Sequence, residues 1–340
     1  MKRKIAYIGF AFLHHKETHA GYHQIKEFLS YDKCFDIQKF YEDNFVPRKR
    51  NILKKIISWI NRKFFGSNDI PLYLLACILY GHINENTLFH FVYGENSLKN
   101  IKPFLNSKNK IVCTFHQPFD WFIANPQFFK YLKIIDAVIL VGNKEIEKFS
   151  SVTGKKNVFY IPHGVCSDFY KPEPFIKKEH MLLTVGNWLR DYNFANKVYR
   201  KLIESDAELQ INIVSSLENE KCIDHHPRIH FLRDISDDVL KDLYCRCSVL
   251  YLPLIRFTAN NALLEAAATG CNIVISSDFA DNSYIPEKFI SVSKMDVQET
   301  VKKIQASMSL CYNYELSEYV KENYSWNIVA KLTMDILNNL

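Results

Sequence analysis

Short apolar runs alternate with helix-forming stretches along most of this sequence, and this alternation constrains the fold more than any other feature. The run DAVILVG, residues 136–142, is apolar without interruption, which is typical of a strand buried on both faces of a parallel sheet. Parallel strands need crossover connections, and helices usually supply them. The sequence therefore predicts an α/β fold with doubly wound parallel sheets.

The alternation extends over two halves of similar size. The predicted strands are 4–9, 35–40, 88–93, 110–115, 136–141, 157–161, 181–186, 209–215, 229–232, 248–252, 272–276 and 289–293. The predicted helices are 21–30, 49–64, 121–132, 143–151, 191–204, 236–246, 260–269, 296–309, 313–322 and 325–339. Residues 161–180 between the halves contain three prolines and no apolar period, which is typical of a linker.

A chain of 340 residues exceeds the roughly 250–300 residues that one hydrophobic core usually serves. We therefore expect two Rossmann-like domains, at 1–162 and 163–324, that face each other across a ligand cleft, followed by a helix at 325–340. Open parallel sheets bind ligands at the carboxyl ends of their strands, so polar residues that follow predicted strands are the candidates for a site.

Composition narrows the class of protein. The net charge of +6 is modest and does not indicate a nucleic-acid partner. Nine irregularly spaced cysteines do not form a disulfide framework, and Cys245 and Cys247 lack a second pair at zinc spacing, which favours a reduced cytoplasmic protein without a metal site.

The apolar run at the amino terminus is interrupted by Gly9 and no cleavage site follows, so we interpret it as a first strand. Residues 70–83 are too short to span a bilayer, which needs about 20 residues.

The stretch RFTANNALLEAAATGCNIVIS, residues 256–276, carries the first candidate site. Helix N-termini present unpaired N–H groups and a partial positive charge, which suits a phosphate. Thr258, Asn260 and Asn261 stand at the predicted helix start, and Glu265 lies one turn further, where a carboxylate can accept two hydrogen bonds from a ribose diol. The alternative is that Thr258 and Asn260 only cap the helix and that Glu265 is solvated.

Two further stretches place polar residues after predicted strands. In LLTVGNWLRDYN, residues 182–193, Gly186 ends a strand and Arg190 can make a bidentate contact to phosphate; the alternative is a surface arginine paired with Asp191. In IVCTFHQPFDWF, residues 111–122, His116 follows a buried strand, and it is either functional or structural.

The loop after the first strand, HHKETHAGYHQIKEFL at 14–29, contains Gly21, which allows a close backbone approach to a ligand. Its spacing is not that of a dinucleotide-binding loop. The histidines of this stretch and of 225–226 lack the spacing of a metal site, so no metal is expected.

Together these stretches resemble the GT-B glycosyltransferases, specifically the large retaining family 4. YIPHGVCSDFYKP is similar to the family's inter-domain IPNGVD…F.P pattern, LLTVGNWLRD to its diphosphate loop, and NNALLEAAATGCNIVIS to its LLEAMACG.PVV.S pattern. TFHQP is similar to its T.H strand end, and NYSWNIVAKLTMDIL to its final helix, which crosses back to the first domain. The resemblance is strong from 157 to 280 and loose from 30 to 110.

The resemblance implies a nucleotide-sugar donor as substrate and no cofactor or metal, with the nucleotide left open between UDP and GDP. It implies that Arg190 and the amides around Asn260 and Asn261 hold the diphosphate, that Glu265 holds the ribose and that His116 contacts the transferred sugar. Residues His19 and Gly21 then form an acceptor-side or phosphate loop.

The sequence departs from the family pattern at two places. The family's E-x7-E pattern has a second glutamate where this chain has Phe257, and its diphosphate loop has an arginine where this chain has Asn187. Arg256 is the candidate for a second cation. These departures leave the donor sugar open.

Residues 48–65, RKRNILKKIISWINRKFF, are predicted to form an amphipathic helix, which bears on membrane association rather than on the donor site. Seven of residues 48–63 are Lys or Arg, and Trp59 lies near the boundary of the apolar stripe. This pattern is typical of a helix on an anionic lipid surface, although most apolar stripes pack on their own domain. We therefore expect a peripheral association with the cytoplasmic face of the membrane.

These features predict a retaining glycosyltransferase that moves a sugar from a nucleotide-sugar donor to a glycan or lipid-linked acceptor in surface polysaccharide synthesis. Two alternatives stay open. One is a nucleotide-sugar epimerase on the same fold, and the other, which Phe257 favours, is an inactive scaffold protein with a GT-B fold.

Overall fold

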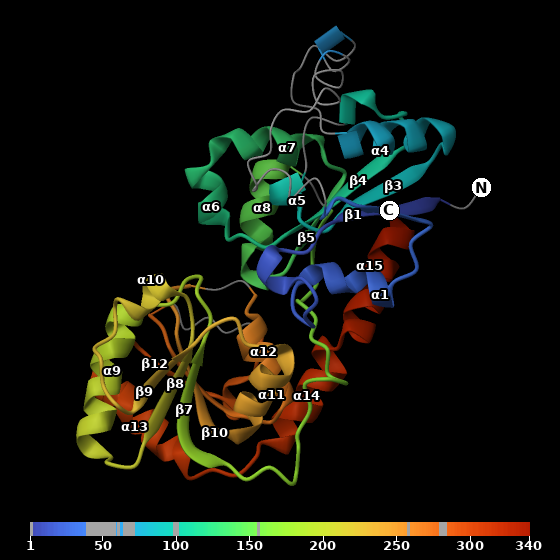
Figure 1. Ribbon diagram of the computed structural model, residues 1–340. Helices are drawn as coiled ribbons and strands as arrows, with labels where there is room; N and C mark the ends of the chain where they lie inside the picture. Colours follow the sequence, from blue (N-terminus) through green and yellow to red (C-terminus); the bar gives the residue numbers. More distant parts are fainter. Residues whose placement is uncertain are drawn as a thin grey trace. The chain divides into compact units, whose positions relative to one another are not determined.

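The computed structural model describes residues 3–38, 59, 62–63, 72–97, 102–154, 157–256, 259–278 and 284–340. The chain divides into two compact units. The first unit comprises Met1–Glu17, Gly21–Ile161 and Ala330–Leu340, and the second comprises Thr18–Ala20 and Pro162–Val329. Figure 1 shows the elements of both units, and each unit is described by itself below.

The first unit is built on a parallel sheet of six described strands in the order β2-β1-β3-β4-β5-β6. The strands are β1 (Lys4–Gly9), β2 (Lys33–Asp36), β3 (Thr87–Phe91), β4 (Lys110–Phe115), β5 (Ala137–Leu140) and β6 (Val158–Tyr160). Its helices are α1 (Ile25–Phe28), α4 (Leu72–Ile83), α5 (Gly94–Ser97), α6 (Phe119–Ala124), α7 (Phe129–Ile134) and α8 (Ile146–Thr153), with the end of α15 (Trp326–Asn339). Short 3-10 turns lie at η1 (Leu13–His15), η2 (Tyr22–Gln24), η3 (Lys102–Phe104), η4 (Pro126–Phe128) and η5 (Asn143–Glu145).

The second unit is built on another parallel sheet of six described strands, in the order β12-β11-β10-β7-β8-β9. The strands are β7 (Glu179–Val185), β8 (Gln210–Val214), β9 (Ile229–Leu232), β10 (Cys247–Pro253), β11 (Asn272–Ser276) and β12 (Ser291–Ser293). The helices are α9 (Tyr192–Ser205), α10 (Leu217–Glu220), α11 (Asp237–Arg246), α12 (Asn261–Ala268), α13 (Val297–Met308) and α14 (Tyr314–Tyr324), with a 3-10 turn η6 (Glu287–Phe289).

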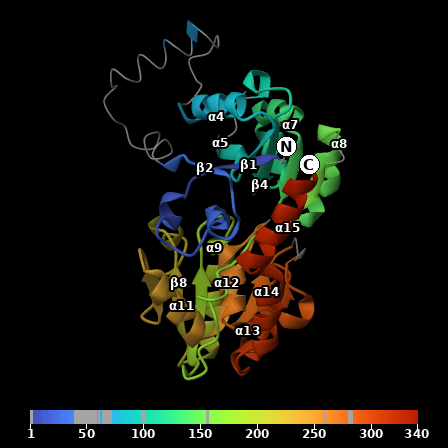
Figure 2. The same ribbon diagram turned by 90° about the vertical axis from the view of Figure 1, so that its right-hand side faces the viewer.

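Helices cover both faces of the second sheet, and each face has its own apolar core. Helices α9 and α13 pack together on one face, where Tyr199 and Ile304 are fully buried. On the other face α12 lies between α11 and α14, as Figure 2 shows, and Leu263 and Leu316 are fully buried. Because both faces are covered, β10 and β11 are buried along their whole length, which agrees with their largely apolar composition.

Side-chain caps begin five helices of this unit. Each cap accepts a hydrogen bond from a backbone N–H of the first turn, which would otherwise lack a partner. The caps are Asp191 for α9, Ser236 for α11, Asn260 for α12, Asp296 for α13 and Asn313 for α14.

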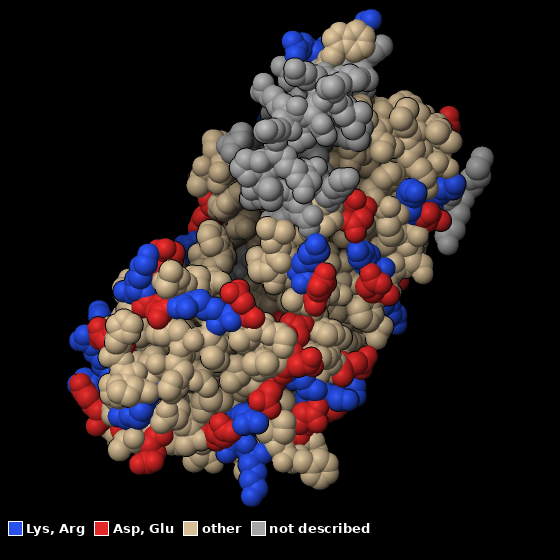
Figure 3. Space-filling model, in the orientation of Figure 1, with Lys and Arg blue, Asp and Glu red and all other residues tan. Residues whose placement is uncertain are grey.

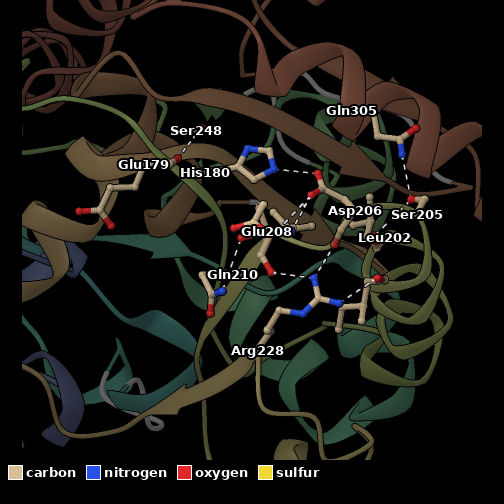
Figure 4. Close-up of polar contacts among 12 residues, drawn as sticks. Glu179, His180, Leu202, Ser205, Asp206, Glu208, Gln210, Arg228, Ser248 and Gln305 are labelled. Carbon is tan, nitrogen blue, oxygen red and sulfur yellow. Dashed lines mark hydrogen bonds and ion pairs between the residues drawn. The ribbon is translucent and has the colours of Figure 1, made fainter.

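A polar network holds the amino edge of the second sheet (Figure 4). Arg228 donates to the carbonyl oxygens of Ile203, Asp206 and Leu209, which secures the end of α9 and the chain that leads into β8. His180 Nε2 lies 2.7 Å from Asp206 Oδ2. This edge is thereby fixed by structural contacts, and the carboxyl edge of the same strands carries the polar groups described below.

The predicted fold class is confirmed, because each of the twelve predicted strands overlaps an observed one in a parallel sheet. The predicted helix 121–132 is wrong in one respect. It breaks at Asn125–Phe128, where Pro126 lacks a backbone N–H and begins a 3-10 turn. The apolar run 70–83, for which the sequence predicted only that it cannot span a bilayer, forms α4. The predicted helix 49–64 lies almost entirely outside the described residues.

Candidate functional site

The strand order of the second sheet reverses between β7 and β10, and this is where a doubly wound sheet opens a crevice at its carboxyl edge. The loops that follow these two strands are joined by backbone hydrogen bonds. Asp191 N–H donates to the Pro253 carbonyl (2.9 Å), and Ile255 N–H donates to the Leu189 carbonyl (3.0 Å). Gly186, Arg190 and Asn260, which are far apart in the sequence, are therefore brought to one place.

Arg190 is a half-buried cation at this crevice. Its guanidinium donates to the carbonyls of Val185 (3.3 Å) and Trp188 (3.0 Å) and to Asn260 Oδ1 (3.1 Å). Burial lowers the pKa of Arg190. No carboxylate of the described part of the chain pairs with it, and Asp191 caps α9 through the Phe194 N–H (2.8 Å) instead. The guanidinium is thus held by neutral groups only, which suits an anionic ligand.

Gly186 makes room for this arginine. Its φ is +111°, and a Cβ built on it would lie 2.8 Å from Arg190 Nη2. Both the backbone conformation and the close approach therefore require glycine at this position. The side chain of the next residue, Asn187, accepts from Ser215 Oγ (2.9 Å) and from Ser216 N–H (2.7 Å), so it links the loop to the end of β8 rather than facing the arginine.

Asn260 has two roles at the start of α12. Its Oδ1 accepts from the Leu263 N–H (3.2 Å), which caps the helix, and from Arg190 Nη2. Its Nδ2 is buried without a hydrogen-bond partner among the described residues. An unsatisfied buried donor is costly, so this amide is a candidate ligand contact. Asn261 is the first residue of α12 and Arg256 lies in the loop after β10, whereas Thr258 and Phe257 are outside the described residues.

Glu265 is buried one turn into α12, with only 4% of its surface exposed, so it is not the solvated residue of the alternative interpretation. It accepts a hydrogen bond from Tyr244 OH (3.1 Å). Burial raises the pKa of Glu265 to about 8, because no described cation pairs with it. Tyr170 stands 6.1 Å from Tyr244, ring centre to ring centre, and its buried hydroxyl has no partner among the described residues. A carboxyl group in this setting can change its charge near neutral pH.

His116 follows β4 at the carboxyl edge of the first sheet. Its ring lies between two tyrosines, with ring centres 4.9 Å from Tyr22 and 4.8 Å from Tyr93. Glu95, at the end of β3, accepts the His116 backbone N–H at 3.1 Å, and the same Oε1 lies 3.4 Å from His116 Nδ1. The strand order of this sheet reverses between β1 and β3, so Glu95 borders the switch point of the first unit.

The loop after β1 is divided between the two units. Gly21 belongs to the first unit, has a φ of +93° and precedes η2. A Cβ on Gly21 would lie 2.7 Å from His15 Nδ1 and 2.9 Å from His23 Nδ1. His19 belongs to the second unit, where its N–H (2.5 Å) and Nδ1 (2.8 Å) both contact Asp237 Oδ2. The His19 ring stacks on Phe169 with centres 3.8 Å apart.

Three site residues were not found from the sequence. Glu95, Tyr170 and Tyr244 lie beside predicted site residues, but only the folded chain brings them there. A glutamate shortly after a predicted buried strand was the signal for Glu95, whereas nothing in the sequence distinguishes the two tyrosines from core aromatics.

Comparison with known proteins agrees with this architecture. Residues 179–309, most of the second unit, match the model of the family described as glycosyl transferases group 1. Among solved structures, sucrose-phosphate synthase from Thermosynechococcus elongatus superposes with a TM-score of 0.66 at 15% identity, over 99% of both chains.

Two further structures superpose over nearly the whole chain. Anabaena HepE in complex with UDP and glucose has a TM-score of 0.67 at 12% identity, over 99% of this chain and 100% of that one. The α,α-trehalose-phosphate synthase from Burkholderia xenovorans, in complex with glucose 6-phosphate, has a TM-score of 0.64 at 11% identity, over 98% and 100%.

The fold is that of the GT-B glycosyltransferases. The resemblance inferred from the motifs is thereby confirmed, and the GT-B fold gives the chain two Rossmann-like domains. A search of curated proteins by sequence finds no match.

Membrane association is the remaining sequence prediction with structural content. Among the described residues no helix is long and apolar enough to cross a bilayer. Of the basic segment 48–65 only Trp59, Arg62 and Lys63 are described, and all three are exposed. Lys63 Nζ lies 4.9 Å from the centre of the Trp59 ring. On the face of the second unit visible in Figure 3, basic and acidic side chains are interspersed.

Proposed function

We propose that this protein is a glycosyltransferase that moves a sugar from a nucleotide-sugar donor to a glycan or lipid-linked acceptor, with retention of the anomeric configuration. The observation that carries the proposal is the half-buried Arg190, which has no carboxylate partner in the described part of the chain and lies at the switch point of the unit that matches the group 1 glycosyltransferase model. A guanidinium whose hydrogen-bond partners are all neutral is well suited to receive an anion.

Transfer of a glycosyl group breaks the bond between the anomeric carbon and the diphosphate, and negative charge develops on the leaving group. Arg190 and the neighbouring start of α12 are fixed before the reaction, so they stabilise that charge without reorganisation. The Asn260 amide donates to the same diphosphate, and Asn261, Arg256 and Thr258 complete this side of the site. In this proposal no metal ion and no cofactor are needed.

Glu265 is assigned to the ribose. A carboxylate oxygen accepts a hydrogen bond from each hydroxyl of a diol, and the charged form is the better acceptor. Because burial raises the pKa of Glu265 to about 8, ribose binding favours loss of its proton. We expect the nucleotide to bind more tightly as the pH rises toward 8.

His116 is assigned to the transferred sugar, and Gly21 and His19 to the loop that approaches the donor phosphates. A carbohydrate substrate is supported by a protein of similar fold, since the structure of HepE is of its complex with UDP-glucose. We infer a role in surface polysaccharide synthesis at the cytoplasmic face of the membrane from the basic segment 48–65, which suits a lipid-linked acceptor.

The decisive experiment measures release of nucleoside diphosphate from a panel of UDP- and GDP-sugars, with and without lipid-linked and free glycan acceptors, in the presence of EDTA. We expect one donor to be hydrolysed slowly alone and consumed faster with the right acceptor. NMR of the product then gives its anomeric configuration.

The alternatives predict different results from the same panel. Conversion of the donor sugar to an epimer without an acceptor would support the epimerase. Calorimetric binding of a nucleotide sugar without turnover on any acceptor would support the inactive scaffold, and the absence of any nucleotide binding would refute the donor site itself.

A further inference from the structure

Glu95 is a buried carboxylate for which the assignments above give no role. Its side chain is 3% exposed, and Oε2 is buried without a hydrogen-bond partner among the described residues. Burying a carboxylate costs free energy that a neutral side chain of similar size would not cost. A buried carboxylate is explained either by a structural contact that it makes or by a need for its charge. The contacts of Glu95 show which explanation applies.

The contacts of Glu95 converge on one residue. Oε1 accepts the His116 backbone N–H at 3.1 Å and lies 3.4 Å from Nδ1 of the same histidine, which is an ion-pair distance when the ring is protonated. The two residues come from neighbouring strands, because Glu95 follows β3 and His116 follows β4. A single oxygen therefore fixes where the backbone of His116 lies and faces its ring.

The buried His90 shows the contacts of a purely structural histidine in this unit. His90 in β3 has Nδ1 2.9 Å from Tyr31 OH and Nε2 2.8 Å from Thr114 Oγ1, so neutral hydroxyls satisfy both nitrogens. Burial lowers the pKa of His90 to about 3, so its ring stays neutral. His116 differs because a carboxylate faces its ring.

We propose that Glu95 is a positioning residue for His116, which directs Nδ1 toward the carboxylate and stabilises positive charge on the imidazole during sugar transfer. The inference rests on the proposed function for its effect on turnover, but the ring orientation does not depend on that function. A carboxylate that orients an imidazole and stabilises its charged form is an established way to tune a functional histidine.

The chain offers a matched control. Glu145 also accepts a backbone N–H, that of Phe119, and it precedes α8 in the same unit. Its carboxylate also pairs with Lys148 at 3.7 Å. Glu145→Gln therefore tests the loss of a carboxylate that supports a backbone N–H and a lysine of the same unit.

The test compares Glu95→Gln, Glu95→Ala and Glu145→Gln by two readouts. Nitrogen-15 NMR of labelled histidines, with His116 assigned by the His116→Ala variant, reports which ring nitrogen carries the proton. We expect Nδ1–H in the wild type and in Glu145→Gln, and a mixture of tautomers in Glu95→Ala. An unchanged His116 signal in Glu95→Ala would overturn the proposal, whether or not the protein transfers sugar.

Turnover gives the second readout. Glu95→Gln keeps the backbone acceptor and removes the charge, so we expect it to fold, to bind the nucleotide normally and to lose at least tenfold in kcat. In the His116→Ala background the same change should have no further effect. Multiplicative losses, or a change confined to the KM of the acceptor, would contradict the positioning role, since Glu95 would then act on the substrate independently of His116.

Discussion

The two sheets of this protein have the same number of described strands but use their switch points differently. In the second unit the reversal between β7 and β10 brings together a half-buried cation, Arg190, a neutral helix cap, Asn260, and a carboxyl group with a raised pKa, Glu265. In the first unit the edge by the reversal between β1 and β3 carries His116, two tyrosines and Glu95. The switch point, which occupies the equivalent place in both sheets, is therefore associated with anion binding in the second unit and with imidazole chemistry in the first.

The difference predicts that variants in the second unit affect the nucleotide and that variants in the first affect the sugar. The largest effect is expected for Arg190→Ala. Loss of this half-buried cation at the switch point should reduce kcat/KM by about a hundredfold to a thousandfold, because a fixed donor to the developing charge is removed. Steady-state kinetics checks this, with Arg200→Ala as the control, because Arg200 is exposed and pairs with Asp224. Equal activity of both variants would make Arg190 a structural residue.

The next largest effect is expected in the first unit. His116→Ala should lower transfer by about a hundredfold while nucleotide affinity in calorimetry stays near that of the wild type. Loss of nucleotide binding together with a fall in Tm would instead identify a structural histidine and would remove the division between the units.

The glycines test whether the position of Arg190 matters beyond its charge. Gly186→Ala and Gly154→Ala both force alanine into a positive φ, +111° and +61°, and should each cost about 1–2 kcal/mol of stability. A Cβ at Gly154 meets nothing within 4 Å, whereas one at Gly186 meets Arg190. Only Gly186→Ala should therefore weaken nucleotide binding, by about tenfold, which is the value of one charged hydrogen bond. Equal affinities in the two variants would show that the arginine can shift without loss.

Glu265→Gln should weaken nucleotide binding by roughly tenfold and abolish its rise with pH. The same substitution should raise the free energy of unfolding, although it weakens nucleotide binding. Because the folded pKa of Glu265, about 8, lies above its ordinary 4.5, the folded state takes up a proton between these values, and the free energy of unfolding falls as the pH rises across that window. The glutamine variant avoids this loss, which reaches about 3 kcal/mol at pH 7. Its Tm should exceed that of the wild type at pH 8 and converge with it near pH 4.5, and identical pH profiles would contradict the assignment.

The smallest effect on the donor site is expected from the basic segment. Changing Lys54, Lys55, Arg62 and Lys63 to Gln should abolish sedimentation with anionic liposomes and leave nucleotide affinity unchanged, because each cation near an anionic surface contributes about 1 kcal/mol. The control changes four exposed lysines of the second unit to Gln, Lys201, Lys221, Lys288 and Lys321. A wild type that ignores anionic liposomes at low salt would remove the main support for a lipid-linked acceptor.

Strands could be predicted because most of them contain a short apolar run, such as Ala137–Leu140 in β5, and the residues after them were predictable as site candidates because parallel sheets bind at that edge. The pairing of Arg190 with Asn260 could not be predicted, since it depends on β7 and β10 being neighbours in the sheet although five elements separate them in the sequence. Glu95 was missed for the same reason, because its partner follows a different strand. The break at Pro126 was missed because the apolar period continues through it.

The identity of the residue that caps α12 decides whether the chain would inhibit its own anion-binding site. Aspartate caps α9 and α13, and it would interact more favourably with the helix dipole than asparagine does. At position 260 an aspartate would also reach Arg190, whose Nη2 lies 3.1 Å from the present amide oxygen. The carboxylate of that aspartate would then pair with Arg190, and every anionic ligand would have to displace it. Asparagine provides the same cap without a charge, so it does not compete with an anionic ligand for Arg190.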